Sequence, residues 1–251
     1  MLRKMLNFPL VKKARRVAKA EGLGAVLRGG VAHIRDAVRA FRYVAQSPQP
    51  KTLAALLDDP PKYCGRIIQP MQIRPEIIGL MKQVRALRPK VIVEIGTANG
   101  GTLFLWTRLA APGATIISVD LPGGKWGDGY AGWRSWLYRR FALPGQTIHL
   151  VRADSHDPAT VEHVRALITQ PVDILFIDGD HSYAGVKQDF EQFAPLVRSG
   201  GLIALHDIAH HRAEYDCHVD KFWAELQQTS RTTELIDHAN QGWAGIGIVE
   251  R

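Results

Sequence analysis

A chain of 251 residues, 46% of them hydrophobic and 22% charged, is long enough for one large globular domain with an extension. Its two cysteines are too few for a disulfide framework, which favours a reducing compartment, and we predict a cytoplasmic protein. We find no signal peptide, because no apolar run follows the basic first ten residues. No stretch reaches the roughly 20 apolar residues that span a bilayer.

The net charge of +8 is concentrated at the start of the chain. Residues 1–50 hold eleven Lys/Arg against two acidic side chains, a balance of +9, whereas the other 201 residues hold 21 basic and 22 acidic ones. We therefore predict a basic helical extension over 1–50 and a catalytic domain over 51–251. Two helices are expected within 1–45. The apolar residues of the second one share a face: Leu27, Val31, Ile34, Val38 and Phe41.

Basic amphipathic helices have several uses, and the sequence leaves them open. They lie on an anionic membrane, bind a partner, or pack on their own domain or on a second subunit with the charges in water. We expect either a peripheral membrane contact or a subunit contact through residues 1–45, and a homo-oligomer. Nucleic acid is not expected as a partner, because the segment lacks interleaved aromatic residues and no recognition module is visible.

The rest of the chain alternates strands with helices. Thr52 is expected to cap a short helix that Pro60-Pro61 ends, and Pro75 to open a helix that reaches Leu87. Buried strands are predicted over 91–95, 115–120, 147–151, 172–177 and 202–205, and helices over 102–109, 133–141, 158–168, 183–199 and 219–227. Two last strands, 233–236 and 245–249, are close in sequence and therefore antiparallel. The pattern predicts an α/β fold, a Rossmann-like seven-stranded, mostly parallel sheet with the last two strands antiparallel.

The first strand runs into a glycine-rich turn. Gly96, Gly100 and Gly101 separate it from an apolar helix, and this geometry lets a ligand approach backbone N–H groups at a helix N-terminus. Glu94 is a carboxylate inside an apolar strand, where an unpaired charge is costly. Asp120 ends the next strand about twenty residues later, where an acceptor for ribose hydroxyls belongs.

Polar residues follow the carboxyl ends of successive strands. They are Glu94, Asp120, Asp154, Asp178 with Asp180 and His181, and His206 with Asp207. Carboxylates this close repel one another unless cations or hydroxyls lie between them, so the row predicts a lined crevice. Loops at 123–130 and 209–218 are expected to form the acceptor pocket. We interpret His210, His211 and His218 as surface or lid residues that could contact an acceptor, and assign Cys217 no role.

Two motifs carry a family resemblance. Glu94-Ile-Gly-Thr-Ala-Asn-Gly-Gly resembles the first motif of class I S-adenosylmethionine (SAM)-dependent methyltransferases. The run from Asp178-Gly-Asp-His-Ser-Tyr to His206-Asp207 resembles more narrowly the macrocin-type and cephalosporin-cluster O-methyltransferase branch, which is methyltransferase family 24-like. Phe222-Trp223 and the closing Gly-Ile-Gly-Ile also fit this branch. The resemblance covers about residues 65–250.

The resemblance implies a SAM-dependent O-methyltransferase, assisted by a divalent metal, that acts on a hydroxyl of a sugar or natural-product-like small molecule. The cofactor-binding residues would be Glu94, Gly96, Thr97, Gly100, Asp120, Asp154, Ser155 and Asp178. The ligands of a Mg²⁺ or Mn²⁺ ion would be Asp178, His206 and Asp207, and the base Asp180 or His181. His206 departs from the branch, which has an acid there. Histidine is a poor ligand for Mg²⁺, so the site has more water ligands, a softer ion such as Mn²⁺ or Fe²⁺, or no metal.

Two other functions fit parts of the pattern. An NAD-dependent dehydrogenase also needs a glycine turn and an acid on the ribose, but Gly96-Thr-Ala-Asn-Gly-Gly lacks the spacing of the dinucleotide fingerprint. No Tyr-x-x-x-Lys pair is placed for hydride transfer. A non-catalytic methyltransferase-like scaffold, with the basic helices as a docking arm, is disfavoured by the intact strand-end acids.

Overall fold

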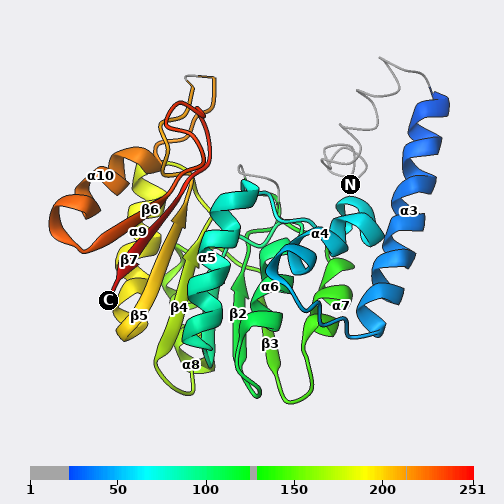
Figure 1. The fold of residues 1–251 in the computed structure, drawn as a ribbon, viewed down its shortest axis with the longest axis horizontal. Helices are drawn as coiled ribbons and strands as arrows, with labels where there is room; N and C mark the ends of the chain where they lie inside the picture. The colour runs from blue at the N-terminus through cyan, green and yellow to red at the C-terminus, as the bar shows by residue number, and fades with distance from the viewer. Residues whose placement is uncertain (1–22, 125–128, 213) are drawn as a thin grey trace.

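The computed structural model describes residues 23–124, 129–212 and 214–251, and a seven-stranded sheet of order β3-β2-β1-β4-β5-β7-β6 forms its centre (Figure 1). The strands are β1 (Val91–Ile95), β2 (Thr115–Val119), β3 (Thr147–Val151), β4 (Val172–Ile177), β5 (Val197–His206), β6 (Thr232–Leu235) and β7 (Ile246–Glu250). Neighbouring strands are parallel except where β7 pairs antiparallel with both β5 and β6. The predicted Rossmann-like sheet with its antiparallel end is confirmed.

Helices cover both faces of the sheet (Figure 1). They are α3 (Leu23–Ala45), α4 (Leu53–Cys64), α5 (Arg74–Leu87), α6 (Gly101–Leu109), α7 (Arg134–Tyr138), α8 (Pro158–Leu167), α9 (Tyr183–Phe193) and α10 (Val219–Thr229), with short 3₁₀ turns η1 (Gly65–Ile67), η2 (Arg139–Phe141) and η3 (Ala194–Leu196). Alternate residues of β1 face opposite ways: Ile92 packs with α3 to α7, whereas Val91 and Val93 pack with α8 to α10. Glu94 therefore points to the side of α5 and α6.

The chain order places the topological switch point of the sheet between β1 and β4. From β1 the chain builds β2 and β3 on one side, and then returns to build β4 and β5 on the other. Ligands of open α/β sheets bind at this switch point, outside the carboxyl ends of the strands. The turn after β1 and the residues after β4 meet there, since the backbone N–H of Asp178 donates to the carbonyl of Ile95 at 2.8 Å.

Pro60-Pro61 does not end its helix, contrary to the prediction. Helix α4 includes both prolines and reaches Cys64. Each proline removes one helical hydrogen bond and crowds the carbonyl four residues earlier. Here one face of the helix, with Leu56, Leu57 and Cys64, is buried against the domain, and this packing outweighs the local penalty.

The fifth strand begins five residues earlier than predicted. Helix α9 ends at Phe193, and Val197 pairs with Val172 at the start of β4, so the predicted helix end just before Gly200-Gly201 is wrong. Pro195 lies in the 3₁₀ turn that closes the helix. Gly201 lies inside β5, where a Cβ would meet the carbonyl oxygen of Asp173 at 2.9 Å.

The extension packs through a face that its periodicity does not indicate. The first predicted helix lies outside the described residues; the second is α3, whose Ala40, Tyr43 and Val44 join the core beside α4 and α5. The apolar residues that share the predicted face are exposed, apart from Phe41. The division at residue 50 stays a prediction. Within the three described ranges, no helix is long and apolar enough to cross a membrane.

Candidate active site

Two glycines let the turn after β1 pack tightly against other segments. Gly96 has a φ of 86°, and a Cβ on it would lie 2.0 Å from the carbonyl oxygen of Asp178. A Cβ on Gly101 would lie 1.9 Å from the backbone nitrogen of Pro70. No other residue fits such approaches. The glycines therefore join the turn to the segment after β4 and to the loop before α5.

Helix α7 holds the same turn from a third side. Gly100 has a φ of 66°, and a Cβ there would lie 2.6 Å from the ring of Tyr138. The hydroxyl of Tyr138, a buried residue, donates to the carbonyl of Ala98 at 2.7 Å. Ala98 itself has a positive φ of 42°, which is uncommon for a residue with a side chain. Contacts within the protein thus hold the turn in a conformation with positive φ angles.

Glu94 is fully buried beneath this turn. Its Oε2 accepts from the hydroxyl of Thr97 at 2.8 Å, and its Oε1 accepts from the indole N–H of Trp106 at 2.8 Å. The hydroxyls of Thr97 and Ser118 lie 2.5 Å apart and extend the network to β2. Burial raises the pKa of Glu94 to about 7, although hydrogen bonds from Thr102, Thr97 and Trp106 lower it. Glu94 therefore orders the turn through Thr97.

The burial of Glu94 predicts a pH-dependent cost to stability. A carboxyl whose pKa is higher in the folded chain stabilises the fold while it is protonated. This contribution is complete below pH 4.5, the ordinary pKa of the group, and is lost as the pH rises through 7. At 1.36 kcal/mol for each pKa unit, the loss is up to about 3 kcal/mol at pH 8. Glutamine can keep the bonds to Trp106 and Thr97, so we expect Glu94→Gln to be the more stable protein at pH 8.

The measurement is urea unfolding of both proteins between pH 5 and pH 8. Wild type should lose stability over this range, and the loss should be smaller in Glu94→Gln. Glu191→Gln, a change at an exposed carboxylate of α9, should behave as wild type. A Glu94→Gln protein that is less stable than wild type at pH 8 would contradict the assignment.

Asp120 binds backbone N–H groups of two segments, the turn after β1 and the segment around Tyr130. Its Oδ2 accepts from Thr97 at 2.8 Å and from Ala98 at 2.9 Å, and its Oδ1 accepts from Tyr130 at 3.1 Å. An ionised carboxylate has about four acceptor positions. These bonds clamp the turn to the segment around Tyr130 and leave room for one further donor, such as a ribose hydroxyl.

Asp178 lies at the carboxyl end of β4 and faces residues from three other segments. Its Oδ2 accepts from the side-chain amide of Gln72 at 2.7 Å. Its Oδ1 lies 3.1 Å from Nδ1 of His206 and 3.6 Å from Nε2 of His181. The loop before α5, the start of α9 and the end of β5 thus meet at one carboxylate.

Asp207 is the second centre of this cluster. Its Oδ2 lies 3.3 Å from Nδ1 of both His206 and His181, and its Oδ1 lies 3.1 Å from Nε2 of His211. Its φ of 65° is in the left-handed region, which Asp tolerates better than most side chains. Left-handed backbone at such a junction is typical of functional sites.

The charges of the cluster support one another. Burial raises the pKa of Asp207, but His206, His211 and His181 outweigh it and hold the pKa well below its usual range. Burial lowers the pKa of His206, but Asp178 and Asp207 outweigh it and hold the pKa well above its usual range. In the absence of another cation the histidine thus carries a proton between the two carboxylates.

The cluster has the donor set of a metal site. Ligand atoms of Asp178, His206 and Asp207 lie within 4.8 Å of one another, and a second set of His181, Asp207 and Cys217 meets the same condition. Nε2 of His206 is buried and has no hydrogen-bond partner in the described part of the chain. Two carboxylates with imidazole suit a divalent ion such as Mn²⁺, and the residues fit such an ion.

Three predicted site residues, Asp180, Asp154 and Ser155, lie outside the turn and the cluster. Asp180 accepts from the backbone N–H of Ser182 at 2.8 Å and lies at the start of α9, whereas its neighbour His181 belongs to the cluster. Asp154, exposed after β3, accepts from the backbone N–H of His156 at 2.9 Å, and Ser155 is half-buried beside it. The turn and the cluster thus gather most of the predicted site residues: Glu94, Gly96, Thr97, Gly100, Asp120, Asp178, His181, His206 and Asp207.

A Tyr-x-x-x-Lys spacing does occur, but at a different surface. Nζ of Lys187 donates to the hydroxyl of Tyr183 at 3.0 Å, and both side chains bind Glu225 of α10. This pair joins the outer sides of α9 and α10. It therefore gives no support to the dehydrogenase alternative.

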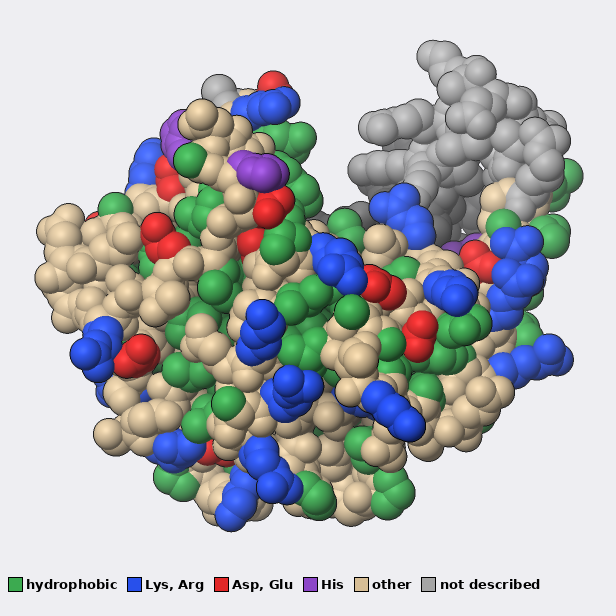
Figure 2. All heavy atoms as spheres, viewed as in Figure 1, with side chains coloured by type: hydrophobic (Ala, Val, Ile, Leu, Met, Phe, Trp, Pro, Cys, Tyr) green, Lys and Arg blue, Asp and Glu red, His purple; other side chains and the backbone are tan. Residues whose placement is uncertain are grey.

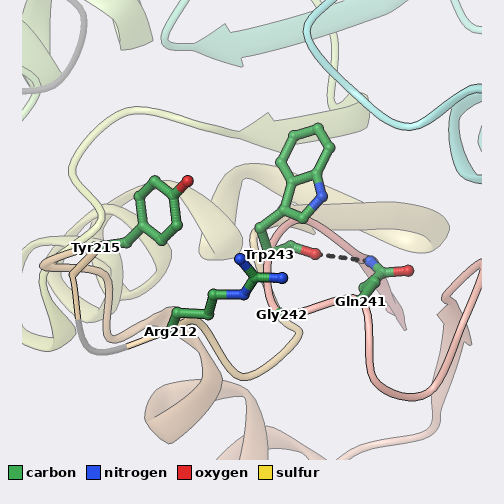
Figure 3. Close-up of a pocket in the computed structure, with 5 residues that line it drawn as sticks. All are labelled: Arg212, Tyr215, Gln241, Gly242 and Trp243. Atoms are coloured by element: carbon green, nitrogen blue, oxygen red, sulfur yellow. Dashed lines mark hydrogen bonds between the residues drawn. The ribbon is translucent and has the colours of Figure 1, made fainter.

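A cavity of about 330 Å³ is lined by the five residues that Figure 3 shows as sticks. Its lining comes from the loops after β5 and before β7: Arg212, Tyr215, Gln241, Gly242 and Trp243. The link to the cluster is His211, whose Nε2 lies 3.3 Å from the backbone nitrogen of Ala244 and 3.1 Å from Asp207. The predicted loop 209–218 forms one wall, and the loop 241–243 was not foreseen.

Several contacts of the site were missed or misjudged from the sequence. His211 is buried against Asp207, so its interpretation as a surface or lid residue is wrong; His210 and His218 are more open and pair with Asp220 and Asp216. Gln72 and Trp106 were not foreseen. The alternation of residues in β1 indicates which face Glu94 takes, but not that Trp106 pairs with it.

Comparisons with known proteins agree with this geometry. The sequence model of a family described as "Methyltransferase domain" matches residues 93–208. The 8-demethyl-8-alpha-L-rhamnosyl tetracenomycin-C 2'-O-methyltransferase of Streptomyces olivaceus is 30% identical over 128 residues, 48% of this chain and 29% of that protein. The uncharacterised protein y4gI of Sinorhizobium fredii is 32% identical over 145 residues, 57% of this chain and 16% of its own. The chain thus spans less than a third of the length of these two curated relatives.

Solved structures support the fold. The O-methyltransferase of Bacillus cereus, solved in complex with S-adenosylhomocysteine, gives a TM-score of 0.54 at 18% identity, over 86% of this chain and 97% of that one. The strand order and this likeness give the chain a Rossmann-like methyltransferase fold. Residues 93–208 are similar in sequence to this methyltransferase family.

Proposed function

We propose that this protein is a SAM-dependent O-methyltransferase that methylates a hydroxyl of a sugar or natural-product-like small molecule, with the help of a divalent metal. The observation that carries the proposal is the meeting of two features at the switch point of the sheet. One is the glycine turn that Glu94 and Asp120 order; the other is the cluster around Asp178 and Asp207. The matched methyltransferase family supports the reaction type.

SAM would lie along the turn after β1. Thr97 and Ala98 are held by Asp120, whose remaining acceptor position suits a ribose hydroxyl. Asp154 and Ser155, after β3, would lie toward the adenine. Because protein contacts already fix the turn, binding would cost little ordering of the backbone.

Methyl transfer needs alignment and one proton acceptor. The acceptor oxygen forms a bond to the methyl carbon as the S–C bond breaks, and the bonding pair stays on sulfur, which gives S-adenosylhomocysteine. The hydroxyl proton must leave to a base. His181 suits this role better than Asp180, because its imidazole lies beside Asp178 and Asp207 in the cluster, whereas the carboxylate of Asp180 accepts from the backbone N–H of Ser182.

A divalent ion held by Asp178, His206 and Asp207 would polarise an acceptor hydroxyl and lower its pKa. Residues outside the set hold two of these side chains in place. Gln72 donates to Asp178, and His211 lies against Asp207. Such supporting contacts orient ligands and protect the geometry of a site.

The acceptor would occupy the cavity beside His211. Tyr215 and Trp243 offer flat apolar surfaces, and Arg212 offers hydrogen-bond donors (Figure 3). Aromatic rings with a few polar groups are typical of pockets for sugars and ring-containing small molecules. The acceptor of the Streptomyces olivaceus relative, a rhamnosyl group by its name, is of this kind.

The test is calorimetric titration with SAM, followed by transfer of labelled methyl groups to a panel of sugars, glycosides and phenols. We expect saturable SAM binding, weakened at least tenfold in Asp120→Ala, and labelled products that survive mild alkali, as ethers do and carboxyl esters do not. Asp157→Asn, at an exposed helix cap where asparagine serves as well, is the matched control. Absence of SAM binding by folded wild type would remove the proposal.

A further inference from the structure

Helix α3 carries an apolar stripe that the described part of the protein leaves uncovered. Leu27, Val31, Ile34 and Val38 are 70%, 68%, 66% and 46% exposed. Steps of four, three and four residues place them in one line along the helix. Single exposed apolar side chains are ordinary, but a continuous line of four marks an interaction surface. We call these four residues the α3 stripe.

The stripe is separate from the face that anchors the helix. Ala40 and Val44 are almost completely buried and pack with α4, and Asp36 lies close to Gly65. The anchoring contacts belong to the second half of α3. Helix α3 is therefore held in place by its other face. The α3 stripe makes none of these anchoring contacts, so the fold does not require its side chains to be apolar.

A row of arginines runs beside the stripe. Arg35, Arg39 and Arg42 are exposed and are spaced by four and three residues, so they form a second line along the helix beside the α3 stripe. Arg35 and Arg39 share one acidic neighbour, Asp36, at 3.1 and 3.7 Å, so the row keeps a net positive charge. Hydrophobic and basic side chains lie together at the α3 edge of the molecule in Figure 2.

Two tryptophans lie on the neighbouring helix segment. The ring of Trp133 contacts that of His33 of α3, with centroids 5.8 Å apart, and Trp136 of α7 is 68% exposed. Tryptophan is enriched where proteins meet the headgroup level of a bilayer. An apolar line with a cationic flank and exposed indoles is the pattern of a helix that lies in the plane of a membrane surface.

We propose that the α3 stripe and its arginine row bind the surface of an anionic lipid bilayer. Charge decides between this occupant and a second copy of the chain, because a copy would bring its own arginine row against the first. The sequence adds to the attraction, since residues 1–50 carry a net charge of +9 and an anionic surface draws basic segments toward it. The membrane contact is independent of the proposed methyl transfer.

The test is co-sedimentation of the full chain with vesicles of phosphatidylcholine alone or with 30% phosphatidylglycerol. Wild type should bind the vesicles with phosphatidylglycerol at least ten times more tightly than those of phosphatidylcholine alone, and 0.5 M NaCl should weaken this binding. Val31→Asp/Ile34→Asp should lose it by at least tenfold, and so should Arg35→Glu/Arg39→Glu, which changes only surface side chains. Lys82→Glu/Lys221→Glu, with the same change of charge on α5 and α10, should stay within twofold of wild type.

Light scattering after size-exclusion chromatography distinguishes the other possible occupants of the α3 stripe. A wild-type dimer that ignores vesicles and becomes monomeric in Val31→Asp/Ile34→Asp would assign the stripe to a second copy. A monomer that ignores vesicles would indicate cover by the chain's own first residues. Vesicle binding that survives both double substitutions would assign the contact to residues outside α3. Each of these results would overturn the proposal, and SAM titration of the same samples reports the proposed function separately.

Discussion

Asp207→Asn is expected to lower kcat/KM for methyl transfer by about 10³-fold and to leave SAM affinity within threefold of wild type. Asp207 lies against three imidazoles and does not touch the glycine turn in any described contact. Asparagine keeps the size of the side chain and tolerates the left-handed φ of 65°. The change therefore removes the negative charge while it keeps the backbone. Initial rates with labelled SAM, together with calorimetric affinity, measure both quantities.

The companion variants decide which side chain takes the proton. His181→Asn should lose about as much kcat as Asp207→Asn. Asp180→Asn should lose little, because the carboxylate of Asp180 accepts from the backbone N–H of Ser182 and an asparagine side chain can accept in the same way. Asp157→Asn again serves as the control. The reverse order, with Asp180→Asn inactive and His181→Asn active, would transfer the role of base to Asp180.

The sheet was predictable because its signals are local. Buried strands read as β-branched runs, and the acids and histidines that follow them sit at strand ends, so that parallel pairing alone brings them to one edge. The positions of Glu94, Asp178 and Asp207 needed nothing more than this rule. The antiparallel end followed from the short connection between the last two strands.

The contacts that complete the site were not predictable, because they join distant positions without a spacing pattern. Gln72 and Asp178 are 106 residues apart, and Gln72 lies in a loop with no periodicity. His211 looks like its neighbours His210 and His218 in the sequence, and only the fold buries it. The helix through Pro60-Pro61 failed for a related reason, since burial outweighed a local rule.

Removal of divalent metal is expected to lower turnover by at least 10²-fold, and Mn²⁺ should restore it better than Mg²⁺. The reason is the donor set, in which the imidazole of His206 stands with the carboxylates of Asp178 and Asp207. Mg²⁺ prefers oxygen ligands, whereas Mn²⁺ accepts imidazole more readily. The measurement is the initial rate after dialysis against EDTA and addition of each ion, with SAM affinity followed in parallel as a check on folding.

His206→Asp is the matched variant, because it converts the set to three carboxylates and should shift the preference from Mn²⁺ toward Mg²⁺. The shift in preference matters more than the absolute rate, since the smaller side chain leaves space in a buried position. If the EDTA-treated wild type keeps its full rate, the metal part of the proposal is wrong, while the methyl transfer still stands. The pair of carboxylates would then be balanced by the proton on His206, whose Nδ1 lies 3.1 Å from Asp178 and 3.3 Å from Asp207.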